Sequence, residues 1–314
     1  MVEEKNNFIK DVIPAFLMGF LFVVVYGLVL FLTEPFVIEG GLQQAFEDIN
    51  DPVNILMIIV IMLIVTVTIL LIAKYWKDKI IQIIILFAVG YTSFYAFFLP
   101  MLTILFPVYQ DIVLIFSLIF AILLVIALYK YPEWYVIDIS GIIIGVGAII
   151  IFGISLGILL VLILLIALAV YDAISVYKTK HMIDLADTVM DLKLPVLLVI
   201  PKTRGYSLLK ETKRLKEKLK DGEERDAFFM GLGDIVMPGI LVAAVYNQIA
   251  TPEGFLVAIS TIIGILIGFA ILMTFVLKGK PQAGLPCLCS GAIIGYIVSS
   301  MILFGELKGL VFTF

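Results

Sequence analysis

Two aspartates, Asp172 and Asp234, each lie inside a stretch that is apolar enough to cross a membrane, on neighbouring segments of the chain. On insertion scales, an aspartate at the centre of a spanning helix costs about 2.5–3.5 kcal/mol, so two of them indicate a chemical role and not anchoring. Two carboxylates a few ångström apart cannot both ionise cheaply and therefore share a proton. The ionised one can then activate water while the protonated one polarises a carbonyl. The pair predicts hydrolysis, and a relay of protons or cations in a transporter or channel is the alternative.

The residues around Asp234 are suited to a crowded site. Gly231 and Gly233 flank Leu232 directly before the aspartate, and their lack of a side chain lets another backbone segment approach closely. Pro238 has no N–H and cannot bond the carbonyl of residue 234, which weakens the helix at the aspartate. We therefore expect irregular, closely packed backbone around this carboxylate.

Two further segments are candidates for the same site. Tyr171 directly precedes Asp172, and its hydroxyl could hydrogen-bond a carboxylate or a reacting oxygen. In the last apolar run, Pro286 is followed by Cys287 and Leu288, and it should free a backbone carbonyl one turn earlier. Irregular backbone at membrane depth is tolerated only where it lines protein or a watery cavity, so we expect these segments to meet.

The sequence offers no other catalytic set. His181 is the only histidine and falls in a polar segment, so neither the paired-histidine zinc site of a metalloprotease nor a membrane-embedded Ser–His couple can be assembled. We expect no metal and no cofactor. The two cysteines, Cys287 and Cys289, lie two residues apart, where a helix points them in different directions, so no disulfide is expected.

The composition identifies the class of protein. Hydrophobic residues make up 63% of the chain and charged residues 15%, with a mean hydropathy of +1.19, which lies outside the range of soluble domains. A net charge of −4 with a single basic segment carries no nucleic-acid signature. We expect a multi-pass integral membrane protein that contacts the lipid bilayer and no nucleic acid.

The fold class predicted from hydropathy is an all-α, polytopic membrane protein. A window of about 20 residues finds nine transmembrane helices. The fifth and sixth are separated because the charge-free segment Ile139–Tyr171 would be about 50 Å long as one helix, against a hydrocarbon core of about 30 Å. The predicted spans are Val12–Leu32, Pro52–Ala73, Ile80–Phe106, Ile112–Tyr129, Tyr135–Phe152, Ile154–Tyr177, Phe228–Gln248, Phe255–Leu277 and Ala283–Phe304.

The distribution of Lys and Arg predicts the orientation. With nine spans and a cytoplasmic N-terminus, twenty of the twenty-one basic residues fall on the cytoplasmic side and only Lys308 lies outside, as the positive-inside rule requires. The C-terminus is then outside. The chain divides into an N-terminal part, 1–177, with helices one to six, a cytoplasmic loop, 178–226, and a C-terminal part, 227–314, with helices seven to nine, all in one membrane domain.

The same topology predicts the depth of the candidate site. Asp172 lies six residues before Lys178, and Asp234 lies eight residues after Asp226. At about 1.5 Å per helical residue, the two carboxylates would lie about 9 Å and about 12 Å from the cytoplasmic ends of consecutive helices. Asp138 lies near the inner end of the fifth span, where we expect it at the membrane interface and not in a site.

These motifs resemble those of the presenilin and signal peptide peptidase intramembrane aspartyl proteases. That family carries Tyr-Asp, Gly-x-Gly-Asp and Pro-Ala-Leu motifs in its sixth, seventh and ninth spans, and the likeness covers the whole chain in count and order. The third motif departs from the family pattern, with Cys287 in place of the central alanine. The matching positions are Tyr171-Asp172, Gly231-Leu232-Gly233-Asp234 and Pro286-Cys287-Leu288.

The resemblance implies an aspartic endopeptidase that cleaves peptide bonds within transmembrane helices of substrate proteins. Asp172 and Asp234 would be catalytic, and the other motif residues would shape the substrate site. The compact, loop-poor chain favours a prokaryotic homologue in the cell membrane, and a homo-oligomer stays open. A substrate helix must unwind before attack, and the apolar run Leu194–Ile200 in the loop is a candidate strand for pairing with it.

Overall fold

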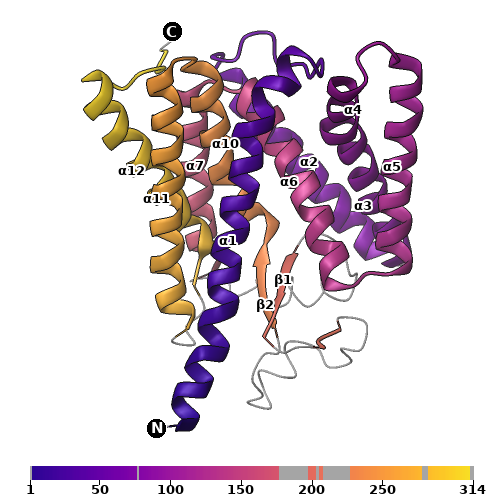
Figure 1. Ribbon diagram of the computed structural model, residues 1–314, viewed down its shortest axis with the longest axis vertical. Coiled ribbons are helices and arrows are strands. Elements are labelled where there is room, and N and C mark those ends of the chain that lie inside the picture. Colours follow the sequence, from indigo (N-terminus) through magenta and orange to yellow (C-terminus); the bar gives the residue numbers. More distant parts are fainter. Residues whose placement is uncertain are drawn as a thin grey trace.

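The structure, a computed structural model, describes residues 2–75, 78–176, 197–202, 205–207, 227–277 and 282–311. It is a bundle of long helices with one small two-stranded sheet at the end where the N-terminal helix begins, while the last helix ends at the opposite end (Figure 1). The helices are α1 (Val2–Ile38), α2 (Val53–Tyr75), α3 (Asp78–Ser93), α4 (Leu99–Leu105), α5 (Gln110–Lys130), α6 (Trp134–Ser155), α7 (Ile158–Ile174), α10 (Leu232–Gln248), α11 (Pro252–Val276) and α12 (Gly284–Phe304).

Most of the predicted spans coincide with these helices. The third one is interrupted, since α3 continues through a π-helical turn, η1 (Phe94–Phe98), into α4, whose second residue is Pro100. The predicted separation of the fifth and sixth spans is confirmed, because α6 ends at Ser155 and α7 begins at Ile158. An unbroken helix through this apolar segment would have been too long for a bilayer.

The start of the predicted seventh span is wrong. Residues Ala227–Gly231 form strand β2, which pairs antiparallel with β1 (Leu197–Pro201) in the register Leu198 to Met230. The apolar and aromatic side chains of Phe228 and Phe229 suit a strand as well as a helix, and the partner strand decides between them. The helix that carries Asp234 therefore begins only at Leu232.

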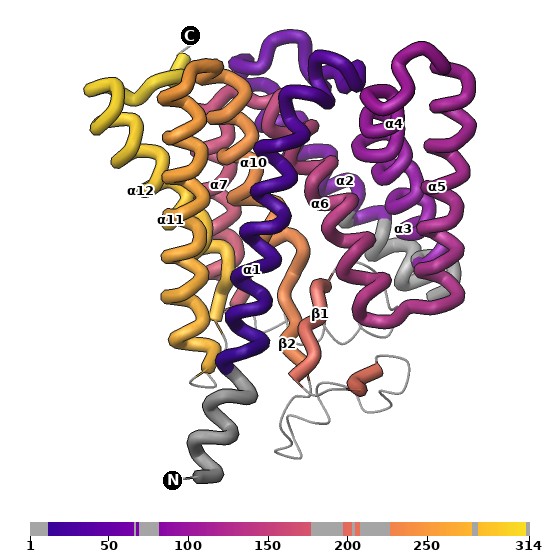
Figure 2. Tube along the Cα trace, viewed as in Figure 1, coloured from indigo at the N-terminus to yellow at the C-terminus, as the bar shows by residue number. Residues whose placement is uncertain are grey.

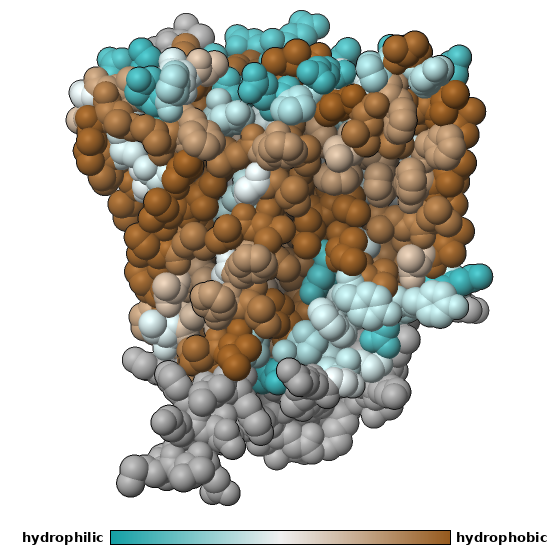
Figure 3. Space-filling model, viewed as in Figure 1, coloured by the Kyte–Doolittle hydropathy of each residue, from teal (hydrophilic) through white to brown (hydrophobic). Residues whose placement is uncertain are grey.

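The surface has the apolar belt of a membrane protein. Among the described residues, six helices are long and apolar enough to cross a bilayer, and three shorter apolar helices accompany them: Val53–Val65 of α2, α7 and α10. Figure 3 shows hydrophobic residues over the middle of the molecule and hydrophilic residues gathered at its upper end and near the sheet. Such a belt buries apolar side chains in lipid while polar loops reach water.

The core is centred on α10. Its residues Ile240–Val245 are all buried, and it contacts α1, α6, α7, α11 and α12, whose traces surround it in Figure 2. Helices α11 and α12 approach each other closely, because a Cβ atom on Gly264 or Gly291 would collide with the backbone of the facing helix. Close packing through small residues is typical of membrane helices. By contrast, α2 is exposed along Ile59–Val65.

Candidate active site

Asp172 and Asp234 come from neighbouring helices and lie together. Asp172 is near the end of α7 and is 8% exposed, whereas Asp234 is partly buried in the first turn of α10. Both carboxylates border the first two residues of α12, Gly284 and Leu285. The two aspartates of the predicted pair therefore lie near one another, and their shared catalytic site stays a prediction.

The N-terminus of α12 touches both carboxylates. The backbone N–H of Leu285 donates a hydrogen bond of 3.1 Å to Oδ2 of Asp172, and the N–H of Gly284 also donates to that carboxylate. Gly284 lies directly against Asp234, because a Cβ atom built on it would be 2.9 Å from Oδ2 and 3.1 Å from Cγ of that residue. The two aspartates thus share a two-residue backbone contact.

Gly284 and Leu285 were not among the predicted site residues. The usable signal was a glycine directly before the Leu285-Pro286 pair in an apolar run, since a glycine permits the close approach that a charged pair requires. The interpretation of Pro286 was also wrong. Helix α12 begins at Gly284, so Pro286 lies in its first turn, where no intrahelical donor is missing. It starts a helix and does not loosen one.

The other residues of that motif hold α12 in place. Leu288 is fully buried in the core, and the backbone of Cys287 packs against Gly268 of α11 so closely that a Cβ atom on the glycine would collide with it. Both cysteines are free, as expected. These contacts fix the position of the α12 N-terminus and hence of the N–H groups that reach Asp172.

The two glycines before Asp234 have different surroundings. A Cβ atom on Gly231 would lie 3.5 Å from Oδ2 of Asp234, whereas one on Gly233 would meet nothing within 4 Å.

The distance predicted for Asp234 from the end of its helix was wrong. The segment after Asp226 is a strand, so the aspartate lies at the third position of its helix and not two turns into it. A carboxylate in a first turn is close to the unpaired N–H groups of the helix.

Tyr171 does not face the pair. Its side chain is 70% exposed, whereas that of the adjacent Asp172 is 8% exposed. Consecutive residues on a helix point in different directions, by about 100°. The structure therefore does not bring the Tyr171 hydroxyl to the carboxylates, and a direct hydrogen bond to them, one of the expectations from the sequence, is not formed.

A different tyrosine supports the Asp234 segment. Tyr26 of α1 is fully buried, and its hydroxyl donates a hydrogen bond of 2.8 Å to the carbonyl of Ile235. Its ring also contacts the helix where Gly239 leaves room for it. Tyr26 is the one polar side chain in the predicted span Val12–Leu32, and this isolation was the signal that sequence reasoning passed over.

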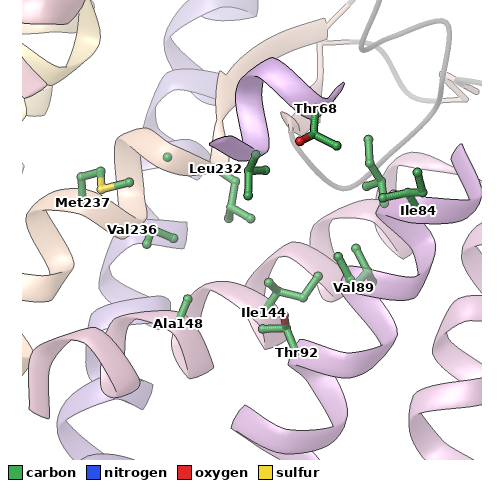
Figure 4. A pocket seen from close by; sticks show the side chains of 13 residues that line it. Thr68, Ile84, Val89, Thr92, Ile144, Ala148, Leu232, Val236 and Met237 are labelled. Atoms are coloured by element: carbon green, nitrogen blue, oxygen red, sulfur yellow. The ribbon is translucent and has the colours of Figure 1, made fainter. Parts of the chain in front are cut away.

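An apolar cavity leads to the Gly-x-Gly-Asp segment. It has a volume of about 580 Å³ and lies between α2, α3, α6 and α10. Figure 4 shows Leu232 and Val236 of α10 facing Ile144 of α6 and Thr68 of α2 across it. The full lining is Val65, Thr68, Ile84, Ile85, Ala88, Val89, Thr92, Ile144, Ala148, Leu232, Gly233, Val236 and Met237.

Asp138 is a buried residue of α6. It is 7% exposed, and its Oδ1 accepts a hydrogen bond of 2.8 Å from the backbone N–H of Val199 in β1. The position of Asp138 at the membrane interface stays a prediction, and its burial was not foreseen because the strand that covers it comes from the distant loop. The predicted strand Leu194–Ile200 is confirmed for Leu197–Ile200, and residues 194–196 lie outside the described residues.

Comparisons with known proteins agree with this geometry. The family model described as "Signal-peptide peptidase, presenilin aspartyl protease" matches residues 19–305. One solved structure of a presenilin family intramembrane aspartate protease, in space group C222, is similar at 32% identity and a TM-score of 0.66, covering 93% of this chain and 99% of that one. A second, in space group P2, has 33% identity and a TM-score of 0.64, covering 91% and 96%. No curated protein matches.

Proposed function

The chain belongs to the signal-peptide peptidase and presenilin family and is an intramembrane aspartyl protease, and we propose that Asp172 and Asp234 are its catalytic pair. One observation carries this assignment: the backbone of Gly284 and Leu285 contacts both carboxylates at once. A pair in this arrangement holds a single proton most readily.

The pair performs general acid–base hydrolysis. The ionised carboxylate takes a proton from water as the water oxygen bonds to the carbonyl carbon, and the protonated carboxylate donates a hydrogen bond to the carbonyl oxygen. When the tetrahedral intermediate collapses, the C–N bond breaks and the leaving nitrogen takes a proton from the pair. The products are a carboxylic acid and an amine, and the pair returns to its singly protonated form.

The proposed topology is nine membrane crossings with a cytoplasmic N-terminus and an external C-terminus. Six long and three shorter apolar helices supply the crossings, and α1 begins at the opposite end of the molecule from the end of α12. Twenty of the twenty-one basic residues then face the cytoplasm. In this orientation the catalytic pair and the sheet are nearer the cytoplasmic side, in a cell membrane that we propose is prokaryotic.

The substrate is the transmembrane helix of another protein, entering with its N-terminus outside. The cavity beside Gly233 supports this proposal because its lining is almost wholly aliphatic, with Thr68 and Thr92 as the polar exceptions. An apolar wall accepts the side chains of a membrane helix without a desolvation cost. The exposed face of α2 gives the cavity a border on the lipid.

The sheet is the proposed receptor for the unwound part of the substrate. The outer edge of β1 is occupied at Val199, whose N–H bonds Asp138. Val199 is opposite Phe229, and opposite residues in an antiparallel pair either bond each other or both point outward. Phe229 therefore presents its backbone groups on the outer edge of β2, and among the described residues the sheet has no third strand.

This register moves the receptor role from β1 to β2. Pro201 fits the same alternation, since it has no N–H and lies at an outward position of β1. A substrate strand added to β2 would run along Phe229 and Gly231 toward Asp234, three residues further on. Its exposed peptide bonds would then pass the catalytic pair.

A transition-state analogue tests the catalytic assignment. A peptide with a hydroxyethylene group in place of the scissile bond imitates the tetrahedral intermediate and should bind the singly protonated pair. A photoreactive form should label the parent protein and not the folded variants Asp172→Asn or Asp234→Asn. Labelling that is equally strong in both variants would remove the two residues from the site.

A further inference from the structure

Asp138 is a buried carboxylate outside the proposed catalytic pair. It lies in α6, one of the helices long enough to span the membrane, with 7% of its surface exposed. A carboxylate at such a position is costly unless it is hydrogen-bonded. The partner is the N–H of Val199, at 2.8 Å and across 61 residues of sequence, so this contact joins a membrane helix to the sheet.

Asp138 is the first of three positions on one face of α6 that contact the site. Gly141 and Gly145 follow at three and seven residues, on the same side of the helix. A Cβ atom on Gly141 would lie 2.8 Å from Cδ2 of Leu198 in β1, and one on Gly145 would lie 3.4 Å from Cδ1 of Leu232. The face thus supports the sheet through Asp138 and Gly141, and the start of α10 through Gly145.

This face sets the position of the sheet relative to Asp234. Strand β2 pairs with β1, Gly231 is opposite Leu197, and α10 begins at the next residue. Apolar packing alone holds a strand weakly against sliding, whereas a directed hydrogen bond to one N–H defines a single height along the helix. A strand that slides by two residues moves by about 6.6 Å and keeps the same side chains facing the core.

We propose that Asp138 is a positioning residue that fixes the height of the sheet against α6 and thereby selects which peptide bond of a bound substrate strand reaches the catalytic pair. This inference rests on the proposed roles of Asp172, Asp234 and the β2 edge. A substrate strand takes its register from β2, so a displaced sheet presents a different bond to the same two carboxylates.

The products of cleavage test this proposal. A single-span reporter is cleaved by the full-length protein in liposomes, and the cut positions are read by mass spectrometry. Asp138→Ala should reduce the ratio of the parent product to displaced products by about tenfold, because the N–H of Val199 loses its acceptor. Asp138→Asn keeps an acceptor oxygen of the same size and should restore the parent product ratio.

A second variant removes the other half of the contact. Val199→Pro deletes the N–H that donates the hydrogen bond to Asp138. Because Val199 is at an outward position of β1, the ladder with β2 loses no hydrogen bond. It should displace the cut as Asp138→Ala does, and the double variant should add nothing further, since both changes break one contact. If Asp138→Ala does not fold, Val199→Pro and Asp138→Asn decide the question alone.

Two results would overturn the positioning role of Asp138. Parent product ratios in folded Asp138→Ala, or in folded Val199→Pro, would overturn the positioning role. The catalytic proposal fails separately, if Asp172→Asn or Asp234→Asn still cleaves the same reporter. Abolished cleavage in those two variants together with unchanged products in Asp138→Ala would leave the catalytic pair standing and remove only this inference.

Discussion

The backbone N–H of Leu285 donates a 3.1 Å hydrogen bond to Oδ2 of Asp172. This bond makes the beginning of α12 a part of the site and not only its support, because the preceding residue, Gly284, lies against Asp234. A helix N-terminus favours nearby negative charge, and here it lies beside two carboxylates that must share one. The relative position of the two aspartates thus depends on a third helix.

Gly284→Ala should inactivate the protein without unfolding it. The new Cβ atom would lie 2.9 Å from Oδ2 of Asp234, so the carboxylate must move, and a displacement of about 1 Å in a catalytic group can cost about 100-fold in rate. The measurement is kcat on a single-span reporter, with thermal unfolding as the fold check. Gly27→Ala is the matched control, since a Cβ atom there meets nothing within 4 Å. Parent-level kcat in Gly284→Ala would show that the contact is not required.

Tyr26→Phe should slow cleavage with little change in KM. The variant keeps the ring against Gly239 and removes only the hydrogen bond to the carbonyl of Ile235, next to Asp234. A neutral hydrogen bond contributes about 0.5–1.5 kcal/mol, so we expect kcat to fall about 3- to 10-fold. Tyr129→Phe, at a tyrosine that is 62% exposed, should leave kcat unchanged. An effect on KM alone would assign Tyr26 to substrate binding instead.

Ala88→Trp should raise KM. Ala88 lines the apolar cavity between α2, α3, α6 and α10, and an indole there occupies space that the proposal gives to the substrate helix. We expect KM to rise about tenfold, as the loss of about 1.4 kcal/mol of apolar contact would produce, with kcat nearly unchanged. Phe116→Trp on α5 is the control, because the Phe116 side chain is 49% exposed and lies outside the cavity lining. Unaltered KM in Ala88→Trp would place substrate entry elsewhere.

The pH dependence of kcat/KM should be bell-shaped. Hydrolysis requires one proton on the pair, so activity is lost when the pair gains a second proton at low pH and when it loses its only proton at high pH. The check is a pH profile of reporter cleavage at constant ionic strength and lipid composition. A rate that rises with pH to a plateau would indicate a single base and contradict the shared proton.

The proposed catalytic aspartates could be singled out from the sequence because a carboxylate in an apolar run is costly and usually has a functional role. The break between α6 and α7 could be predicted because a bilayer limits helix length. Phe228–Gly231 could not be assigned to a strand, since its apolar residues suit either structure and its partner is the distant β1. The contacts of Asp138 and Gly284 could not be predicted, because their partners, Val199 and Asp234 respectively, lie far away in sequence.

The most direct measurement is cleavage of a single-span reporter by the purified protein in liposomes, comparing the parent with Asp172→Asn and Asp234→Asn. Each substitution alone should abolish cleavage while the protein stays folded, because neither carboxylate can both activate water and polarise the carbonyl. Asp111→Asn, in the exposed first turn of α5, should cleave like the parent. Parent-level cleavage by either folded site variant would contradict the catalytic pair.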